Sequence, residues 1–99
     1  MRVRPGVYLI PDVAVFYPDK PPLLPVTPPL VAIEVFSPDD RFPAVREKLE
    51  EYRAWGVKHV WLVDPHAKRM YIGPGLTEVA TLRIPELDLE LKPADVFEQ

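Results

Sequence analysis

Proline controls the layout of this chain, because 14 of its 99 residues are proline. The proline ring fixes one backbone dihedral angle and removes the amide hydrogen, so proline interrupts helices and central strands. The prolines fall between the apolar runs, and they are densest in the segment DKPPLLPVTPP at residues 19–29. We therefore predict short regular elements joined by stiff turns, with an extended surface loop over residues 19–29.

The composition is that of a globular protein, with 47% apolar and 27% charged residues. A chain of this length predicts a single domain over residues 1–99. The absence of cysteine excludes disulfides and thiolate metal sites. The sequence has neither the apolar core of a signal peptide nor a run long enough to span a membrane, so we expect a cytoplasmic location. The net charge of −3 argues against avid nucleic-acid binding through a basic surface.

The first half of the chain carries two strand signals. Residues 7–17 are rich in Val, Ile, Phe and Tyr, and we expect a strand centred on residues 13–16 with Asp12 at its entrance. Residues 30–36, LVAIEVF, are apolar except for Glu34. An almost unbroken apolar run of this length predicts a strand that is buried on both faces.

The main helix is predicted over residues 41–55, which are rich in strong helix formers and are followed by Gly56 as a C-terminal cap. The turn at residues 37–40 offers several N-cap candidates. The helix is long enough to cross over to a strand at residues 57–64, so that strand should lie parallel to the strand at 30–36. Shorter elements should follow: a strand over 67–72, another over 78–84 and a helical turn over 93–97. The expected class is α/β (α+β), with a mixed sheet and one crossover helix.

Three charged residues are candidates for chemistry. Glu34 would face a buried or cleft environment, where it either forms an ion pair, caps the next turn or binds a cation. A helical wheel places Lys48 between Tyr52 and Trp55 on the inward face, where it either finds an acceptor or extends along the rings to water. Asp12 follows a proline, and this pair is also ordinary turn chemistry.

The combination is more informative than any single residue. An acid at a strand entrance, an acid in the neighbouring strand and an inward lysine on the next helix could converge. Mg²⁺ or Mn²⁺ prefers oxygen ligands, and one or two carboxylates with several waters can hold it. We therefore expect Asp12 and Glu34 to bind the cation, which activates water, and Lys48 to orient that water or neutralise charge on a phosphate.

In chain order, the sequence resembles the Uma-two family of restriction endonucleases, within the PD-(D/E)xK superfamily, in the segments PDVAVF, LVAIEVFSP, EKLEEYRAWGVKHVWLVDP, MYIG and IPELDLELKPADVF. The resemblance implies a restriction-endonuclease-like fold and metal-dependent hydrolysis of DNA. Asp12 and Glu34 match the two acids of the superfamily motif. Phe36 stands where the superfamily has a strand lysine, and Lys48 matches the helix position to which this family moves the lysine.

Family members usually carry a sizeable region before the Pro-Asp motif, whereas eleven residues precede Asp12 here. The resemblance thus implies a shortened core with an open sheet edge, and an open edge invites pairing with a second copy. We expect a homodimer. His59 and His66 have no metal-site spacing, Asp64 is expected to end a strand in a turn, and Ser37 lacks an evident base.

Three functions remain open from the sequence. The leading hypothesis is a metal-dependent endonuclease that hydrolyses phosphodiester bonds in DNA through Asp12, Glu34 and Lys48. The alternative is a catalytically impaired remnant of the fold that acts as a dimerisation or interaction module. A nucleic-acid-binding domain without catalysis is least favoured, because basic and aromatic residues are not interleaved.

Overall fold

The computed structural model describes residues 2–4, 7–8, 11–17, 28–73 and 75–97. The elements in chain order are β1 (Arg2–Arg4), β2 (Val7–Tyr8), β3 (Val13–Val15), β4 (Val31–Val35), α1 (Phe42–Trp55), β5 (His59–Asp64), β6 (Arg69–Ile72), β7 (Thr77–Val79), β8 (Leu82–Ile84), the 3-10 helix η1 (Pro85–Leu87), β9 (Leu89–Leu91) and α2 (Pro93–Phe97). The proline-rich loop predicted over 19–29 lies outside the described residues, apart from Pro28 and Pro29.

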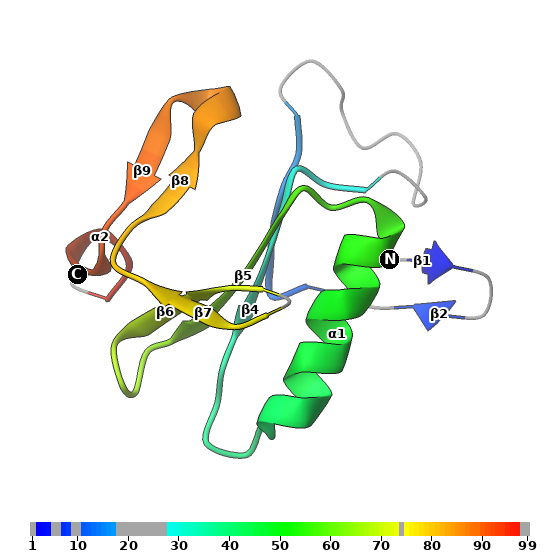
Figure 1. Ribbon diagram of the computed structural model, residues 1–99, viewed down its shortest axis with the longest axis horizontal. Coiled ribbons are helices and arrows are strands. Elements are labelled where there is room, and N and C mark those ends of the chain that lie inside the picture. Colours follow the sequence, from blue (N-terminus) through cyan, green and yellow to red (C-terminus); the bar gives the residue numbers. More distant parts are fainter. Residues whose placement is uncertain (1, 5–6, 9–10, 18–27, 74, 98–99) are drawn as a thin grey trace.

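A five-stranded mixed sheet in the order β3-β4-β5-β6-β7 forms the centre of the molecule (Figure 1). Strands β4 and β5 run parallel and are joined by α1, as the sequence predicts. The other neighbouring pairs in this sheet are antiparallel. Two small antiparallel pairs, β1-β2 and β8-β9, lie outside it. The predicted mixed sheet with one crossover helix is therefore confirmed.

The two faces of the sheet are covered by different elements: α1 packs on one face, and the β8-β9 hairpin with α2 lies on the other (Figure 1). Side chains alternate across a strand, so β4, β5 and β6 contribute to both layers. The helix-side core contains Ala32, Val45, Leu49, Tyr52, Val57, Val60 and Leu62. The hairpin-side core contains Leu30, Val31, Trp61, Val63, Met70, Leu82 and Ile84. Burial on both faces explains why residues 30–36 read as an almost unbroken apolar run.

Helix α1 begins and ends differently. Gly56 closes it with φ of 118°, and the amides of Gly56 and Val57 donate to carbonyls in the last turn, as expected for a glycine cap. At the other end the N-cap residue is Arg41, which makes no side-chain capping bond. The predicted N-cap in residues 37–40 is therefore wrong, because the Asp40 carboxylate instead accepts the amide of Ser37 at 2.8 Å and closes the preceding turn.

The predicted strand over 78–84 is also wrong, since it is two strands in different sheets. Strand β7 extends the central sheet, whereas β8 pairs with β9. Leu82 and Ile84 are buried in the hairpin-side core. The chain breaks at Ala80 and Thr81 because a single straight strand could not both extend the sheet and cover its face. The predicted helical turn at 93–97 is confirmed as α2.

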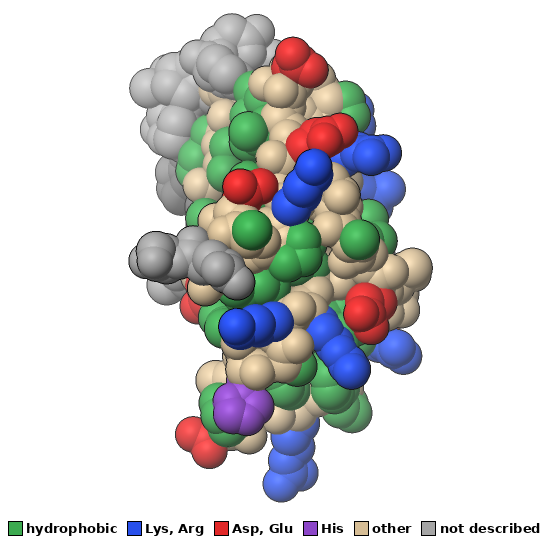
Figure 2. All heavy atoms as spheres, turned by 90° about the vertical axis from the view of Figure 1, so that its left-hand side faces the viewer, with side chains coloured by type: hydrophobic (Ala, Val, Ile, Leu, Met, Phe, Trp, Pro, Cys, Tyr) green, Lys and Arg blue, Asp and Glu red, His purple; other side chains and the backbone are tan. Residues whose placement is uncertain are grey.

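The surface that carries the hairpin and α2 has mixed character (Figure 2). Acidic and basic side chains are interspersed there with apolar ones, which agrees with the small net charge of −3. Within the described ranges, no helix is both long enough and apolar enough to cross a membrane.

Candidate functional site

The alternation of side chains along β4 determines the face to which Glu34 points. Ala32 faces α1, so Glu34, two residues later, points to the same side. Glu34 is only 4% exposed, and it is the buried charged residue of the described core. Its Oε1 accepts a hydrogen bond from the Tyr52 hydroxyl at 2.7 Å, and the Nζ of Lys48 lies 3.5 Å from the same oxygen. A buried carboxylate needs such partners, because burial without them is costly.

Asp12 is placed by the pairing of β3 with β4. Val13 pairs with Ile33 in an antiparallel register, and continuing that register by one residue sets Asp12 opposite Glu34. The Asp12 Oδ2 accepts the backbone amide of Val35 at 2.7 Å. This bond holds Asp12 at the end of the sheet where β4 stops, beside Glu34.

Lys48 comes from the middle of α1, one turn before Tyr52. Its side chain is 44% exposed, so the stem reaches solvent while the ammonium group lies at Glu34. The sequence left open whether Lys48 finds an acceptor or extends to water. In the structure its ammonium group lies at Glu34 and its side chain also borders water.

The three side chains line one open cavity of about 530 Å³. Its wall is completed by the turn after β4 and the first turns of α1, and it includes Ser37, Asp40 and Arg41. The structure thus brings Asp12, Glu34 and Lys48 together from a strand entrance, a strand and a helix.

Burial and the neighbouring side chains shift the pKa of Glu34 in opposite directions. Burial raises the pKa of the Glu34 carboxyl group above its ordinary value of 4.5, and the neighbouring Asp12 carboxylate adds to this increase. The hydrogen bond from Tyr52 and the positive charge of Lys48 lower the same pKa, but the net direction is upward. Burial and the Glu34 carboxylate also raise the pKa of Tyr52, so its hydroxyl stays protonated and acts as the donor.

The donor set fits a hard divalent cation. Asp12 and Glu34 each have one oxygen held by a protein donor, through Oδ2 and Oε1 respectively. The two carboxylates also interact with each other, so they lie side by side at the cavity. In the described ranges, no group of three or more His, Cys, Asp or Glu residues could hold a metal. Two carboxylates with water suit Mg²⁺, which keeps much of its hydration shell.

The Uma2 (Uma-two) family, described as "Putative restriction endonuclease", matches residues 1–97. The chain belongs to this family. Among solved structures it is similar to a protein of Anabaena variabilis described as a putative nuclease belonging to DUF820, with a TM-score of 0.58 and 24% sequence identity. The match covers 70% of this chain and 44% of that chain, and it shows a shared fold. A comparison with curated proteins found no match.

Phe36 lies directly after the end of β4 in this Uma2 chain. It follows Glu34 by two residues, and it packs against the helix-side core. Its ring stacks on Phe42 at the start of α1, with ring centroids 4.5 Å apart. Phe42 itself is 46% exposed. Neither ring is among the described residues that line the cavity, whereas Lys48 lines it from α1.

Tyr52 is the site residue that sequence reasoning missed. The wheel assigned it to the apolar arc of the helix, and its ring is indeed completely buried in the helix-side core. Residues four apart on a helix are neighbours on one face. The spacing from Lys48 could therefore have indicated that the Tyr52 hydroxyl reaches the same acceptor.

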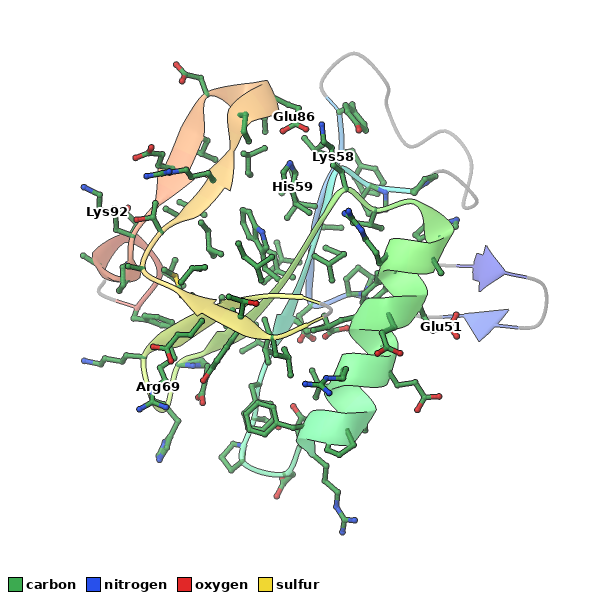
Figure 3. The ribbon with its side chains drawn as sticks, in the orientation of Figure 1. Glu51, Lys58, His59, Arg69, Glu86 and Lys92 are labelled. Atoms are coloured by element: carbon green, nitrogen blue, oxygen red, sulfur yellow. The ribbon has the colours of Figure 1, made fainter. Side chains whose placement is uncertain are left out.

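Asp64, His59 and His66 lie outside the cavity in this Uma2 chain, whereas Ser37 is part of its wall. Asp64 accepts the amides of His66 and Ala67, both at 3.1 Å, which is the strand-ending turn that the sequence predicts. Glu86 joins two other residues near the start of β5 (Figure 3). Its Oε2 lies 2.6 Å from the Nζ of Lys58, and its Oε1 lies 2.9 Å from the Nε2 of His59. This cluster ties the hairpin layer to the sheet.

Proposed function

We propose that this Uma2 protein is a divalent-metal-dependent endonuclease that hydrolyses phosphodiester bonds in DNA. Asp12 and Glu34 hold Mg²⁺ or Mn²⁺, and Lys48 acts on the phosphate or on the attacking water. The observation that carries the proposal is the convergence of these three side chains on one cavity of about 530 Å³. The family description and the nuclease-like fold support the same class of reaction.

Each residue has a role that follows from its surroundings. Asp12 and Glu34 present one carboxylate oxygen each, oriented by the Val35 amide and the Tyr52 hydroxyl. Lys48 places a positive charge at the cavity, where it can neutralise the charge that develops on a phosphate. A bound divalent cation supplies Lewis acidity and lowers the pKa of a coordinated water.

The raised pKa of Glu34 is consistent with a cation site. Two neighbouring carboxylates in a partly buried cleft repel each other, and a divalent cation removes that repulsion. The negative charge that lowers the intrinsic stability of the cleft is thus the charge that attracts the metal. This trade between local stability and function is common at active sites.

Metal titration tests the proposal most directly. We expect Mn²⁺ to bind the wild-type chain, detected by calorimetry and by a rise in Tm, and to support nicking of supercoiled plasmid DNA. Glu34→Gln should lose both the binding and the nicking. Glu47→Gln is the matched control, because Glu47 lies on the exposed face of the same helix and does not line the cavity. It should behave as wild type.

The opposite result has a clear meaning. If the wild-type chain binds no Mn²⁺ and leaves plasmid DNA intact, the catalytically impaired remnant becomes the better description. Metal binding without nicking would retain the cation site and remove the nuclease activity.

We also propose that the protein forms a homodimer through β3. Among the described strands of the central sheet, β3 has a neighbour on one side only, and Val13 on it is 45% exposed. An unpaired strand edge favours pairing with another chain, and a lysine on the edge opposes it. Light scattering should show a dimer that Val13→Lys dissociates. Thr77→Lys on the opposite edge strand β7 should leave it intact. A monomeric wild type would contradict the proposal.

A further inference from the structure

Two donors from α1 approach one oxygen of Glu34. The Tyr52 hydroxyl lies 2.7 Å from Oε1, and the Lys48 ammonium lies 3.5 Å from the same atom. The first distance is that of a normal O–H···O hydrogen bond, whereas the second is longer than a normal N–H···O bond. Tyr52 is therefore the hydrogen-bond partner of Oε1, and Lys48 contributes mainly through its charge.

The two donors also differ in how firmly they are held. Tyr52 has no exposed surface, and its ring packs in the helix-side core with Leu49 and Leu62. Lys48 has a side chain that is 44% exposed, with many accessible rotamers. A carboxylate oriented by Lys48 alone would move with it. A carboxylate oriented by Tyr52 keeps one position while the lysine moves.

We propose that Tyr52 is a positioning residue: its hydroxyl anchors Oε1 of Glu34, so that Oε2 is presented to the cation and the Lys48 ammonium is left free for the substrate phosphate. This inference rests on the proposed function. It assigns different tasks to three residues of one helix-strand contact. Glu34 binds the cation, Tyr52 orients Glu34, and Lys48 acts on the substrate.

The hydrogen bond of Asp12 resembles that of Glu34, because in each carboxylate one oxygen accepts a bond from a protein donor. Its Oδ2 is anchored by the Val35 amide at 2.7 Å, as Oε1 of Glu34 is anchored by Tyr52. Each carboxylate thus has one oxygen that a protein donor orients, and the two carboxylates also interact with each other. Groups that orient metal ligands in this way commonly change metal affinity or activity by about 10- to 100-fold when they are removed.

The test uses Tyr52→Phe, which removes the hydroxyl and keeps the ring. Its control is Tyr71→Phe, because Tyr71 packs against the same core from β6 and forms its side-chain hydrogen bond with Arg69. We expect Tyr52→Phe to remain folded and to bind Mn²⁺ about tenfold or more weakly than wild type in calorimetry. Tyr71→Phe should bind Mn²⁺ like wild type.

Lys48→Met tests whether the loss of any partner of Glu34 has the same effect as the loss of the Tyr52 hydroxyl. Removing a positive charge near a cation site should leave Mn²⁺ affinity unchanged or increase it, while plasmid nicking falls. Tyr52→Phe should weaken Mn²⁺ binding, so of the two variants only Tyr52→Phe should lower the affinity. If folded Tyr52→Phe binds Mn²⁺ as tightly as wild type, the proposed role of Tyr52 is wrong.

Crystal structures of wild type and Tyr52→Phe provide a readout that does not depend on metal. Without the hydroxyl, the Glu34 carboxylate should turn toward Lys48, and the distance between Oε1 and Nζ should shorten from 3.5 Å to hydrogen-bond length. An unchanged carboxylate would overturn the inference. If wild type binds no Mn²⁺ but the carboxylate does turn, the proposed function fails and the orientation by Tyr52 stands.

Discussion

The carboxylate of Asp12 and the backbone amide of Val35 are joined by a hydrogen bond of 2.7 Å, although they are 23 residues apart in the chain. The bond ties the entrance of β3 to the end of β4. It also sets Asp12 beside Glu34, which precedes Val35. The same hydrogen bond therefore stabilises the sheet and positions a residue of the candidate cation site. Different substitutions of Asp12 can separate these two roles.

Asp12→Asn should preserve the fold and remove the activity. The asparagine oxygen can still accept the Val35 amide, but the side chain lacks the negative charge for a cation. We expect unfolding in urea close to wild type and no detectable nicking with Mg²⁺. Asp12→Ala should lose activity too and should also cost about 1 kcal/mol in the free energy of unfolding, because the Val35 amide loses its partner. Equal destabilisation by both variants would argue against this role of the hydrogen bond.

Glu34→Gln should stabilise the metal-free protein at neutral pH. Burial is the main reason that the folded-state pKa of Glu34 is raised above 4.5. The folded protein therefore favours the neutral carboxyl group. The stability that this neutral form contributes is fully present below pH 4.5 and is lost as pH rises through the folded-state pKa. A neutral glutamine avoids that loss and can still accept the Tyr52 hydroxyl. We expect a gain of about 0.5–2 kcal/mol at pH 7 that shrinks toward pH 4.5. Urea unfolding across this pH range measures it, with Glu47→Gln as the control.

Lys48→Met should reduce the rate of DNA cleavage about 10²- to 10³-fold, the usual effect of removing one charged donor from a developing anion. The methionine retains the length and helix propensity of the side chain, so the helix should be undisturbed. Single-turnover nicking with saturating Mn²⁺ measures the effect. Lys92→Met, at an exposed lysine outside the cavity, should leave the rate unchanged. A similar loss in both variants would indicate a general effect of charge on DNA binding.

Glu86 should control stability in acid. Hydrogen bonds from Lys58 and other donors lower its pKa to about 2. The stability that its ionised form contributes is fully present above the ordinary value of 4.5 and is lost as pH falls toward about 2. We expect Glu86→Gln to have a lower Tm than wild type at neutral pH and the difference to close between pH 4.5 and 2. Glu90→Gln is the control, since its partner Arg83 lies on the same hairpin and the pair is largely exposed.

Local features of this chain were readable because they depend on neighbours in sequence. The end of α1 at Gly56 follows from the conformational freedom of glycine, and the parallel pairing of β4 with β5 follows from a crossover helix. The break between β7 and β8 was not readable. Residues 78–84 have one continuous strand-like pattern, and only the need to cover the second face of the sheet divides it.

The candidate site shows the same division. The residue types indicated Glu34 as a lone acid in an apolar strand, and the helical wheel placed Lys48 on the inward face of α1, so the sequence alone indicated that these charges could meet. It did not determine that Tyr52, 18 residues from Glu34, supplies the hydrogen bond, nor that Phe36 stacks on Phe42. Those contacts join side chains from different elements. Their atoms meet only after strand register and helix packing have set the distance between elements, which is a property of the tertiary structure.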